Sequence, residues 1–251
     1  MWRRLQYLGG ALSVVVAVST LVYFGIIYRP ASCQDGRQNG KESGVDCGGV
    51  CNTMCREYIM PPAILWSRSF EVAPGVWNAV AYVENKNAES GAASIAYTFT
   101  LFEAGNIPIV ERRGTTSLAP HDTAIIVEPS LLVGARVPNR TQITFEHNPA
   151  WQSFTAGSIP VVAVKEVLLT NQDSAPRISA TIVNESAGDL KAVEATAVAF
   201  DAQGNALAAS RTIIPNLPRG EKKSIVFTWP MPFSAEATRI EVHARSPLNT
   251  P

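Results

Sequence analysis

The chain has 251 residues, of which 46% are hydrophobic and 17% charged, and its 21 basic and 21 acidic residues give a formal net charge of zero. A balanced charge argues against a nucleic-acid-binding protein, and the hydrophobic content argues against a disordered chain. The balance is uneven, because Arg3, Arg4 and Arg29 stand in the first thirty residues, which contain no acid. The remainder is therefore mildly acidic, with a net charge of −3.

An uncharged, apolar run occupies residues 5–28. As an α-helix rising about 1.5 Å per residue, it reaches about 36 Å, which is enough to cross a hydrocarbon core of about 30 Å. Two arginines precede the run and one follows it, so the positive-inside rule predicts a cytoplasmic N-terminus, an extracytoplasmic remainder and a cell-membrane location. The run is longer than the apolar region of a cleaved signal peptide, and no A-x-A cleavage site follows closely. An uncleaved anchor is therefore favoured over a cleaved signal or a lipoprotein.

The next segment, residues 33–56, is polar and rich in glycine, and it contains all four cysteines of the chain. It has too few apolar residues to form a core, so cysteines clustered there on the oxidising side of a membrane predict two disulfides. Zinc binding by the thiolates is disfavoured because zinc sites usually contain closer Cys pairs. Four cysteines allow three pairings, and the sequence does not choose among them. The cysteines are Cys33, Cys47, Cys51 and Cys55.

The same segment offers hard oxygen ligands in a glycine-rich loop, at Asp35, Asn39, Glu42 and Asp46. Such groups suit calcium, which takes six to eight oxygen ligands. Their spacing departs from that of an EF-hand, and these residue types are also common in ordinary turns. The preferred interpretation is a disulfide-stapled knot without a cofactor, and a calcium site is the alternative.

From Cys33 to Cys51 the sequence reads C-x-D-G-x-x-N-G-x-E-x-x-x-D-C-G-G-x-C. This pattern resembles a short Cys-rich motif that recurs in secreted and surface-anchored proteins. The resemblance implies an extracytoplasmic location and no enzymatic activity.

The rest of the chain repeats itself at an offset of 99 residues. Asn85 corresponds to Asn184, and the turn pair Gly105-Asn106 corresponds to Gly204-Asn205. One constant offset over several landmarks predicts two whole domains rather than an array of small units. Both copies contain runs rich in β-branched and aromatic residues, and the Gly-Asn pairs between these runs indicate hairpin turns.

The predicted fold class is therefore all-β, with two tandem immunoglobulin-like β-sandwiches preceded by one transmembrane α-helix and a small disulfide-rich segment. The predicted parts are a cytoplasmic N-terminus (residues 1–4), a transmembrane helix (5–28), a Cys-rich neck (33–56), β-sandwich 1 (62–148), β-sandwich 2 (158–246) and a tail (247–251).

The two copies also resemble the FxLYD-type family of extracytoplasmic β-sandwiches and fibronectin-III-like domains. Copy one has Asn85, then F-T-L-F-E at residues 99–103 and the turn glycine Gly105. Copy two has Asn184 and L-P-R-G at residues 217–220 before an aromatic strand, but it departs at the F, Y and D positions. The resemblance implies binding or spacer modules and carries over no catalytic residue.

Sequence motifs for catalysis are missing: the sequence has no G-x-S-x-G, H-E-x-x-H, P-loop or G-x-G-x-x-G. Its three histidines, His121, His147 and His243, fit turns or strand ends. The tryptophans Trp66, Trp77, Trp151 and Trp229 fit a core or a domain interface, and Trp151, in the linker between the copies, is the best candidate for a wedge or binding residue.

The sequence therefore predicts a non-enzymatic, membrane-anchored binding or scaffold module of the cell envelope. Its expected partner is another envelope protein or a surface glycan, and no nucleic acid. One alternative is an accessory subunit of a membrane protein complex, and a second is an extracytoplasmic hydrolase with a cryptic site. The sequence gives no indication of the oligomeric state.

Overall fold

The computed structural model describes residues 2–28, 30–146 and 149–248. The chain divides into two compact units, Met1–Cys51 and Asn52–Pro251, and each is described by itself. Arg29, which enters the topology prediction, lies outside the described residues, as do His147 and residues 249–251 of the predicted tail.

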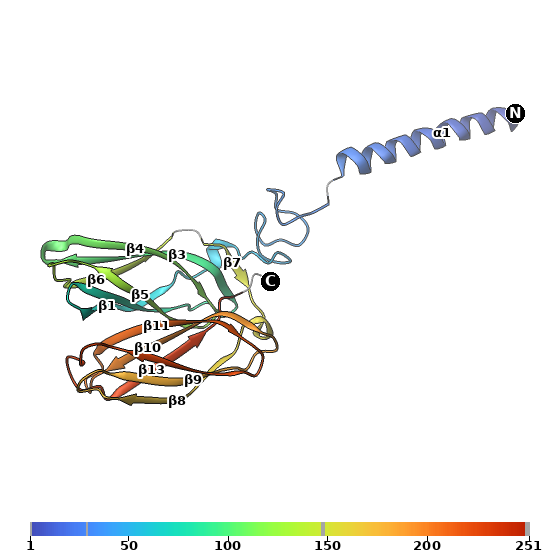
Figure 1. The fold of residues 1–251 in the computed structure, drawn as a ribbon. Coiled ribbons are helices and arrows are strands. Elements are labelled where there is room, and N and C mark those ends of the chain that lie inside the picture. The colour runs from blue at the N-terminus through green and yellow to red at the C-terminus, as the bar shows by residue number, and fades with distance from the viewer. Residues whose placement is uncertain (1, 29, 147–148, 249–251) are drawn as a thin grey trace. The chain divides into compact units, whose positions relative to one another are not determined.

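The first unit begins with helix α1 (Trp2–Val22), which continues into the π-helical turn η1 (Tyr23–Ile27) (Figure 1). Every side chain of α1 is exposed, and the most apolar 18-residue stretch within Trp2–Gly25 has a mean hydropathy of 1.9. The hydroxyl groups of Ser13 and Thr20 donate to carbonyl oxygens of the same helix, at 2.8 and 2.7 Å, so these polar groups are satisfied within it. The helix is therefore long and apolar enough to cross a membrane.

The second unit consists of β-strands, with short 3₁₀ turns at η2 (Arg56–Tyr58), η3 (Ala104–Asn106) and η4 (Ala156–Ser158). The first half contains β1 (Ala63–Ala73), β2 (Val76–Glu84), β3 (Ser90–Glu103), β4 (Ile107–Leu118), β5 (Thr123–Leu132), β6 (Arg140–Phe145) and β7 (Trp151–Ser153). The second half contains β8 (Val162–Thr170), β9 (Arg177–Asn184), β10 (Leu190–Phe200), β11 (Ala206–Leu217), β12 (Lys222–Thr228) and β13 (Arg239–Arg245).

Each half has two antiparallel sheets with the same strand order. The first half has β1-β2-β5 and β4-β3-β6, with β7 added to β3, and the second half has β8-β9-β12 and β11-β10-β13. The first residues of β1 and β8 are 99 residues apart, and the same is true of β4 and β11, β5 and β12, and β6 and β13. The structure therefore shows in its strands the repeat that the sequence predicted.

The two sheets of each half enclose a core of their own. On β3 the alternate residues Ile95, Tyr97, Phe99 and Leu101 are buried, as expected when every second side chain of a strand points to one face. They pack against Ile126 and its neighbours from the facing sheet. The second core has the same construction and contains Ile178, Ile182, Leu217 and Phe227. The sheets of each half are thus arranged as in a β-sandwich.

A third buried cluster, here called the joining cluster, connects the two halves. It combines Val80, Tyr82, Ile125 and Val127 of β2 and β5 with Val198, Phe200, Ala206 and Ala209 from the second half. Tyr82 stacks on Trp66 with ring centroids 4.4 Å apart, and its hydroxyl donates to Glu241 Oε2 at 2.8 Å. Because β2 and β5 are covered on both faces, they read as nearly continuous hydrophobic runs.

Candidate functional site

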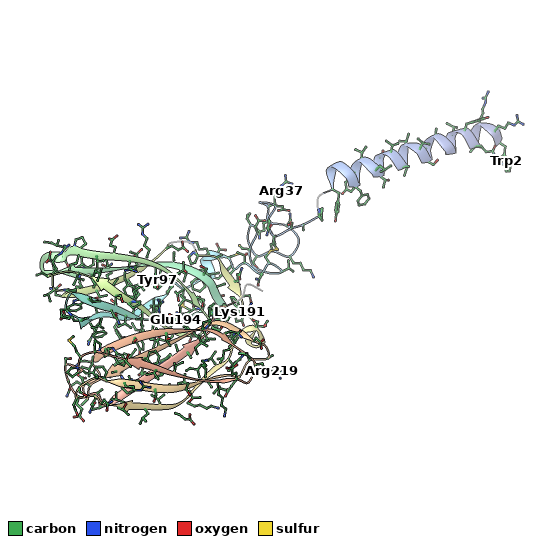
Figure 2. The ribbon with its side chains drawn as sticks, in the orientation of Figure 1. Trp2, Arg37, Tyr97, Lys191, Glu194 and Arg219 are labelled. Carbon is green, nitrogen blue, oxygen red and sulfur yellow. A yellow bond between two sulfur atoms is a disulfide. The ribbon has the colours of Figure 1, made fainter. Side chains whose placement is uncertain are left out.

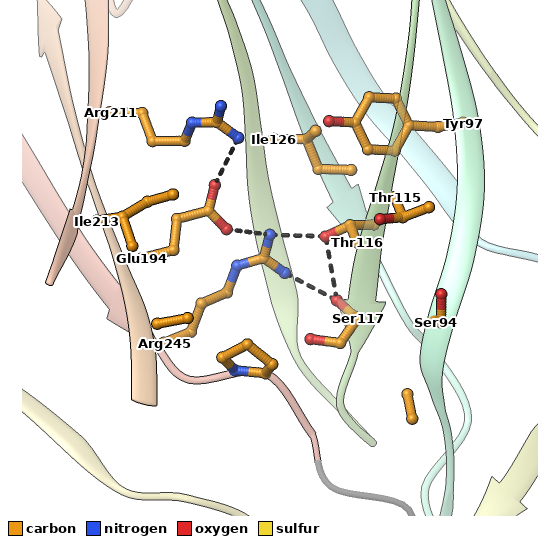
Figure 3. A pocket seen from close by; sticks show the side chains of 13 residues that line it. Ser94, Tyr97, Thr115, Thr116, Ser117, Ile126, Glu194, Arg211, Ile213 and Arg245 are labelled. Carbon is orange, nitrogen blue, oxygen red and sulfur yellow. Dashed lines mark hydrogen bonds and ion pairs between the residues drawn. The ribbon is translucent and has the colours of Figure 1, made fainter. Parts of the chain in front are cut away.

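A cleft of about 240 Å³ lies between the two halves. Its walls come from β3 and β4 of the first half, with Tyr97 and Thr115, and from β10, β11 and β13 of the second, with Glu194, Arg211 and Arg245 (Figure 3). Figure 2 labels Tyr97 on the first half and Glu194 on the second. The cleft therefore brings together these residues of the two halves, which lie 79 to 148 positions apart in the sequence.

Glu194 is the centre of a charged network in this cleft. It accepts from Arg245 Nη2 at 2.8 Å and from Arg211 Nη1 at 3.3 Å. Arg245 also donates to Ser117 O at 2.8 Å and to Thr116 Oγ1 at 2.7 Å, so its guanidinium links β13 to β4 of the other half. Hydrogen bonds of this charge-assisted kind are short and strong, and they fix geometry as well as adding energy.

Tyr97 and Glu128 form a second polar contact beside the cleft. The Tyr97 hydroxyl donates to Glu128 Oε1 at 2.6 Å, and both residues are buried. Burial, together with the hydrogen bond to Glu128, raises the pKa of Tyr97 above its ordinary value. The phenol therefore stays protonated at neutral pH and acts as a donor.

We expect the substitution Arg245→Met to lower the free energy of unfolding by about 2 kcal/mol, because hydrogen bonds to charged groups contribute about 1.5–3 kcal/mol and the site is partly open to water. Urea unfolding measures the change. The matched control is Arg112→Met, because Arg112 is exposed on β4, where a substitution should change stability by less than about 0.5 kcal/mol. Equal effects of the two substitutions would contradict a linking role for Arg245.

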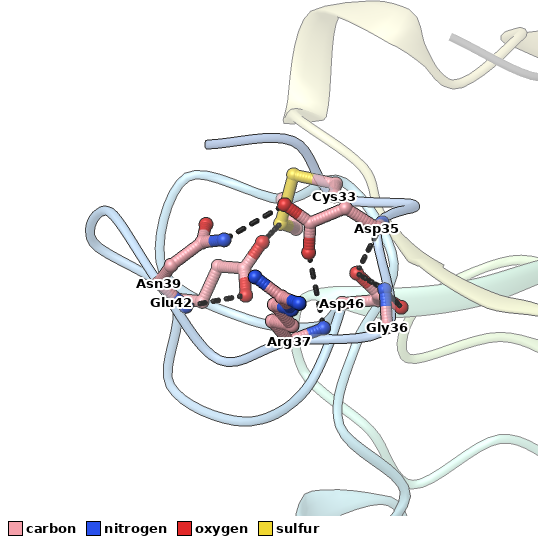
Figure 4. The surroundings of a disulfide bond; sticks show 8 residues. Cys33, Asp35, Gly36, Arg37, Asn39, Glu42 and Asp46 are labelled. Atoms are coloured by element: carbon pink, nitrogen blue, oxygen red, sulfur yellow. Dashed lines mark hydrogen bonds between the residues drawn. A yellow bond between two sulfur atoms is a disulfide. The ribbon is translucent and has the colours of Figure 1, made fainter. Parts of the chain in front are cut away.

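The neck of the first unit is held by a disulfide between Cys33 and Cys51 (Figure 4). Cys47 and Cys55 are disulfide-bonded as well, and no cysteine is free. The prediction of disulfides at all four cysteines is confirmed.

The four predicted calcium ligands lie in this neck, and they accept or donate hydrogen bonds within the loop (Figure 4). The Asp46 carboxylate accepts the backbone N–H groups of Asp35 and Gly36, at 2.9 and 2.8 Å. Asp35 accepts from Asn39 Nδ2 at 2.7 Å, and this bond lowers the pKa of the Asp35 carboxyl. Glu42 Oε2 accepts the Asn39 backbone N–H at 3.2 Å. These polar residues therefore form hydrogen bonds that shape the loop, as such residues commonly do in turns.

The carboxylate oxygens of Asp35, Glu42 and Asp46 do not converge on a common position for a metal ion. Among the described residues, one set of three His, Cys, Asp or Glu side chains has its ligand atoms within 4.8 Å of one another, namely Cys33, Glu42 and Cys51. The two sulfur atoms of that set are joined in a disulfide and are not thiolates. Calcium binding by Asp35, Asn39, Glu42 and Asp46 stays a prediction.

We expect the double substitution Cys33→Ser and Cys51→Ser to destabilise the neck by about 3 kcal/mol, since a disulfide closing a loop of this length restricts the unfolded chain by that amount. The neck has almost no apolar burial to replace the bond. Amide hydrogen exchange of residues 34–50 should accelerate strongly, while residues 62–248 exchange as in the wild type. Unchanged exchange in the neck would contradict this dependence.

A larger groove, of about 860 Å³, is lined by Trp151, the residue that the sequence suggested as a wedge or binding residue. Its floor contains Ile59 and Ile64 from the segment before and at the start of β1, and Phe145 from β6. Trp151 itself is 7% exposed and belongs to the first core rather than to the joining cluster. The prediction that Trp151 forms a wedge between the two copies is therefore wrong, because β7 pairs with β3 and places Trp151 in the first core.

Trp66, Trp77 and Trp229 lie in or against buried clusters, and the two described histidines lie in a turn and on a strand. Trp66 packs against the joining cluster, Trp77 against the first core, and Trp229 lies in the second core. His121 occupies a turn with a φ of 53°, and His243 lies on β13 with Nε2 3.6 Å from Glu241 Oε2. Burial lowers the pKa of His243.

The sequence analysis did not single out Glu194, Arg211 or Arg245. One signal was present: Glu194 is the only charged residue in positions 192–200, which are otherwise small or apolar. Such a residue indicates a polar partner on the face that covers the strand.

No family model and no curated protein matches the chain. Among solved structures, the chain is similar to the crystal structure of red sea bream transglutaminase, with 9% identity and a TM-score of 0.23. That similarity covers 76% of this chain and 32% of the transglutaminase chain. At this TM-score it carries no argument about activity.

Proposed function

We propose that the protein is a non-enzymatic binding and scaffold module, anchored by α1 in the cell membrane and displayed on the extracytoplasmic side. Its second unit would consist of two tandem immunoglobulin-like sandwiches that present a fixed surface to another envelope protein. The matched strand orders of the two halves support the tandem arrangement. The disulfides and the N-terminal arginines support the extracytoplasmic side.

The observation that carries the binding role is the groove beside Trp151. Its volume of about 860 Å³ and its largely apolar floor are typical of binding clefts, which commonly measure about 300–1,000 Å³. One wall is β6, which in the described part of the chain forms ladder pairs with β3 alone; Ser67 of β1 donates to Thr141 O at its other edge, and residues 142–145 of β6 line the groove. An extended segment of a partner protein could add to such an edge, with main-chain hydrogen bonds for affinity and the apolar floor for specificity.

A photoreactive side chain at position 144 tests this proposal in the full chain in native membranes. Thr144 is exposed and lines the groove, while the control position, Thr228, is exposed on β12. We expect a discrete protein adduct from position 144 and none from position 228, and we expect Ile64→Asp to abolish it. The partner identified from the adduct must then bind the purified wild-type chain and must not bind the purified Ile64→Asp variant. A carbohydrate adduct would favour a glycan partner. Equal labelling at positions 144 and 228 would contradict the proposal that the groove is the binding site.

A second candidate function is an accessory subunit that docks through its membrane helix. A Cβ atom added at Gly9 or Gly10 would meet no other atom within 4 Å, so this part of the α1 surface is free of bulky side chains. Small residues of this kind permit close contact between helices in membranes. Replacing the apolar run of α1 by leucines separates the two functions. Loss of the adduct at position 144 would favour the subunit, and its retention would favour the groove.

A further inference from the structure

The cleft between the halves holds an excess of positive charge. Glu194 is a single carboxylate shared by two guanidinium groups, those of Arg211 and Arg245. The three side chains are only 18–25% exposed, so the excess charge is poorly solvated. The buried carboxyl group of Glu128 does not line the cleft but accepts from the hydroxyl of Tyr97, which does, so the excess of one positive charge applies to the lining residues alone.

Donor groups in the cleft also outnumber the acceptors. Arg245 uses both of its terminal nitrogens on Glu194, Thr116 and Ser117. Arg211 makes one hydrogen bond, at 3.3 Å, and within residues 2–28, 30–146 and 149–248 no other acceptor is recorded for its guanidinium. Across the cleft, Ser94 and Thr115 present hydroxyl groups to the same space (Figure 3).

We propose that this cleft binds a small organic carboxylate. Its oxygens would accept from Arg211 of the second half and from the hydroxyl groups of Ser94 and Thr115 of the first half. Its short apolar part would pack against Ile126 and Ile213, which also line the cleft. This inference does not rest on the groove or on the proposed function.

Two features favour a carboxylate of a few carbon atoms over other anions. One excess positive charge matches a monoanion, and the planar fork of a guanidinium fits a carboxylate with two parallel hydrogen bonds. The volume of about 240 Å³ is below that of a drug-sized site, which limits the ligand to a small molecule.

The test is isothermal titration of the full chain in detergent with butyrate, at constant ionic strength in chloride. We expect saturable binding with a Kd on the order of 1 mM, and a loss of tenfold or more in Arg211→Gln. Ser94→Leu should abolish binding as well, because it fills the cleft from the opposite half and leaves the Arg–Glu network untouched.

The control is Arg112→Gln, an exposed arginine of β4 outside the cleft, which should bind butyrate as the wild type does. Absent binding, or binding that survives both cleft substitutions, would overturn the site. Phosphate in place of butyrate distinguishes the anion class: tighter binding of phosphate would overturn the carboxylate assignment.

Discussion

Replacing Asn184 by Asp is expected to lower the free energy of unfolding by about 4 kcal/mol at neutral pH. Asn184 is 1% exposed, and its Nδ2 donates to Gly188 O and to Leu217 O, both at 2.8 Å. Its Oδ1 accepts the Ser186 backbone N–H at 2.9 Å. An aspartate would turn an oxygen toward two carbonyl oxygens, leave both without a donor and bury a charge.

Urea unfolding followed by the fluorescence of Trp229, which lies in the second core, measures this loss. The matched control is Asn216→Asp, at an exposed position of β11, which should change stability by less than about 0.5 kcal/mol. The deficit of Asn184→Asp should shrink as the pH falls. The buried carboxyl has a folded-state pKa above its unfolded value, and its protonated form regains an O–H donor. A loss equal to that of the control would contradict the structural role.

The same construction occurs at Asn85 in the first half, where Nδ2 donates to Ser90 O and Ala119 O, both at 2.8 Å. This correspondence explains why the sequence repeat was visible at all. No other side chain as short as that of asparagine offers the two donors and one acceptor that close this loop between two strands, so both copies retain it. The turn glycines Gly105 and Gly204 are retained for a related reason, because both have a φ of 79°, which other residues rarely adopt.

Local patterns therefore predicted the strands, the hairpin turns and the disulfide segment, because each depends on neighbours in the sequence. The alternating burial along β3 and the Ala-rich strand β10 are examples in which side-chain size and the repeat were sufficient. The apolar helix was predicted at residues 5–28 from its uncharged length, whereas α1 begins at Trp2 and ends at Val22, and a π-helical turn continues it to Ile27.

The cleft and the joining cluster could not be predicted in the same way. Both depend on which face of β2 and β5 meets β10 and β11, and a strand that is apolar on both faces does not reveal its second partner. Trp151 shows the same limit: its position in the linker suggested a wedge, but a three-residue strand pairing with β3 places it in the first core. The network of Glu194 and Arg245 joins residues of different strands and halves, so no spacing in the sequence marks it.

The second large effect is expected for Gly114→Ala, which should destabilise the first half by about 3–5 kcal/mol. A Cβ atom at this position of β4 would collide with the Tyr97 ring and hydroxyl and lie 2.8 Å from Glu128 Oε1. Tyr97 is 3% exposed and packs in the first core, so it cannot move aside without opening that core or breaking its bond to Glu128.

Urea unfolding measures the effect, with Gly157→Ala as the control, because a Cβ there meets no atom within 4 Å. The two variants should differ by at least about 2 kcal/mol. A double-mutant cycle with Tyr97→Phe identifies the cause, since removing the hydroxyl relieves part of the collision and makes Gly114→Ala less costly in that background. Additive effects in the cycle would mean that Gly114 acts through the backbone of β4 and not through its contact with Tyr97.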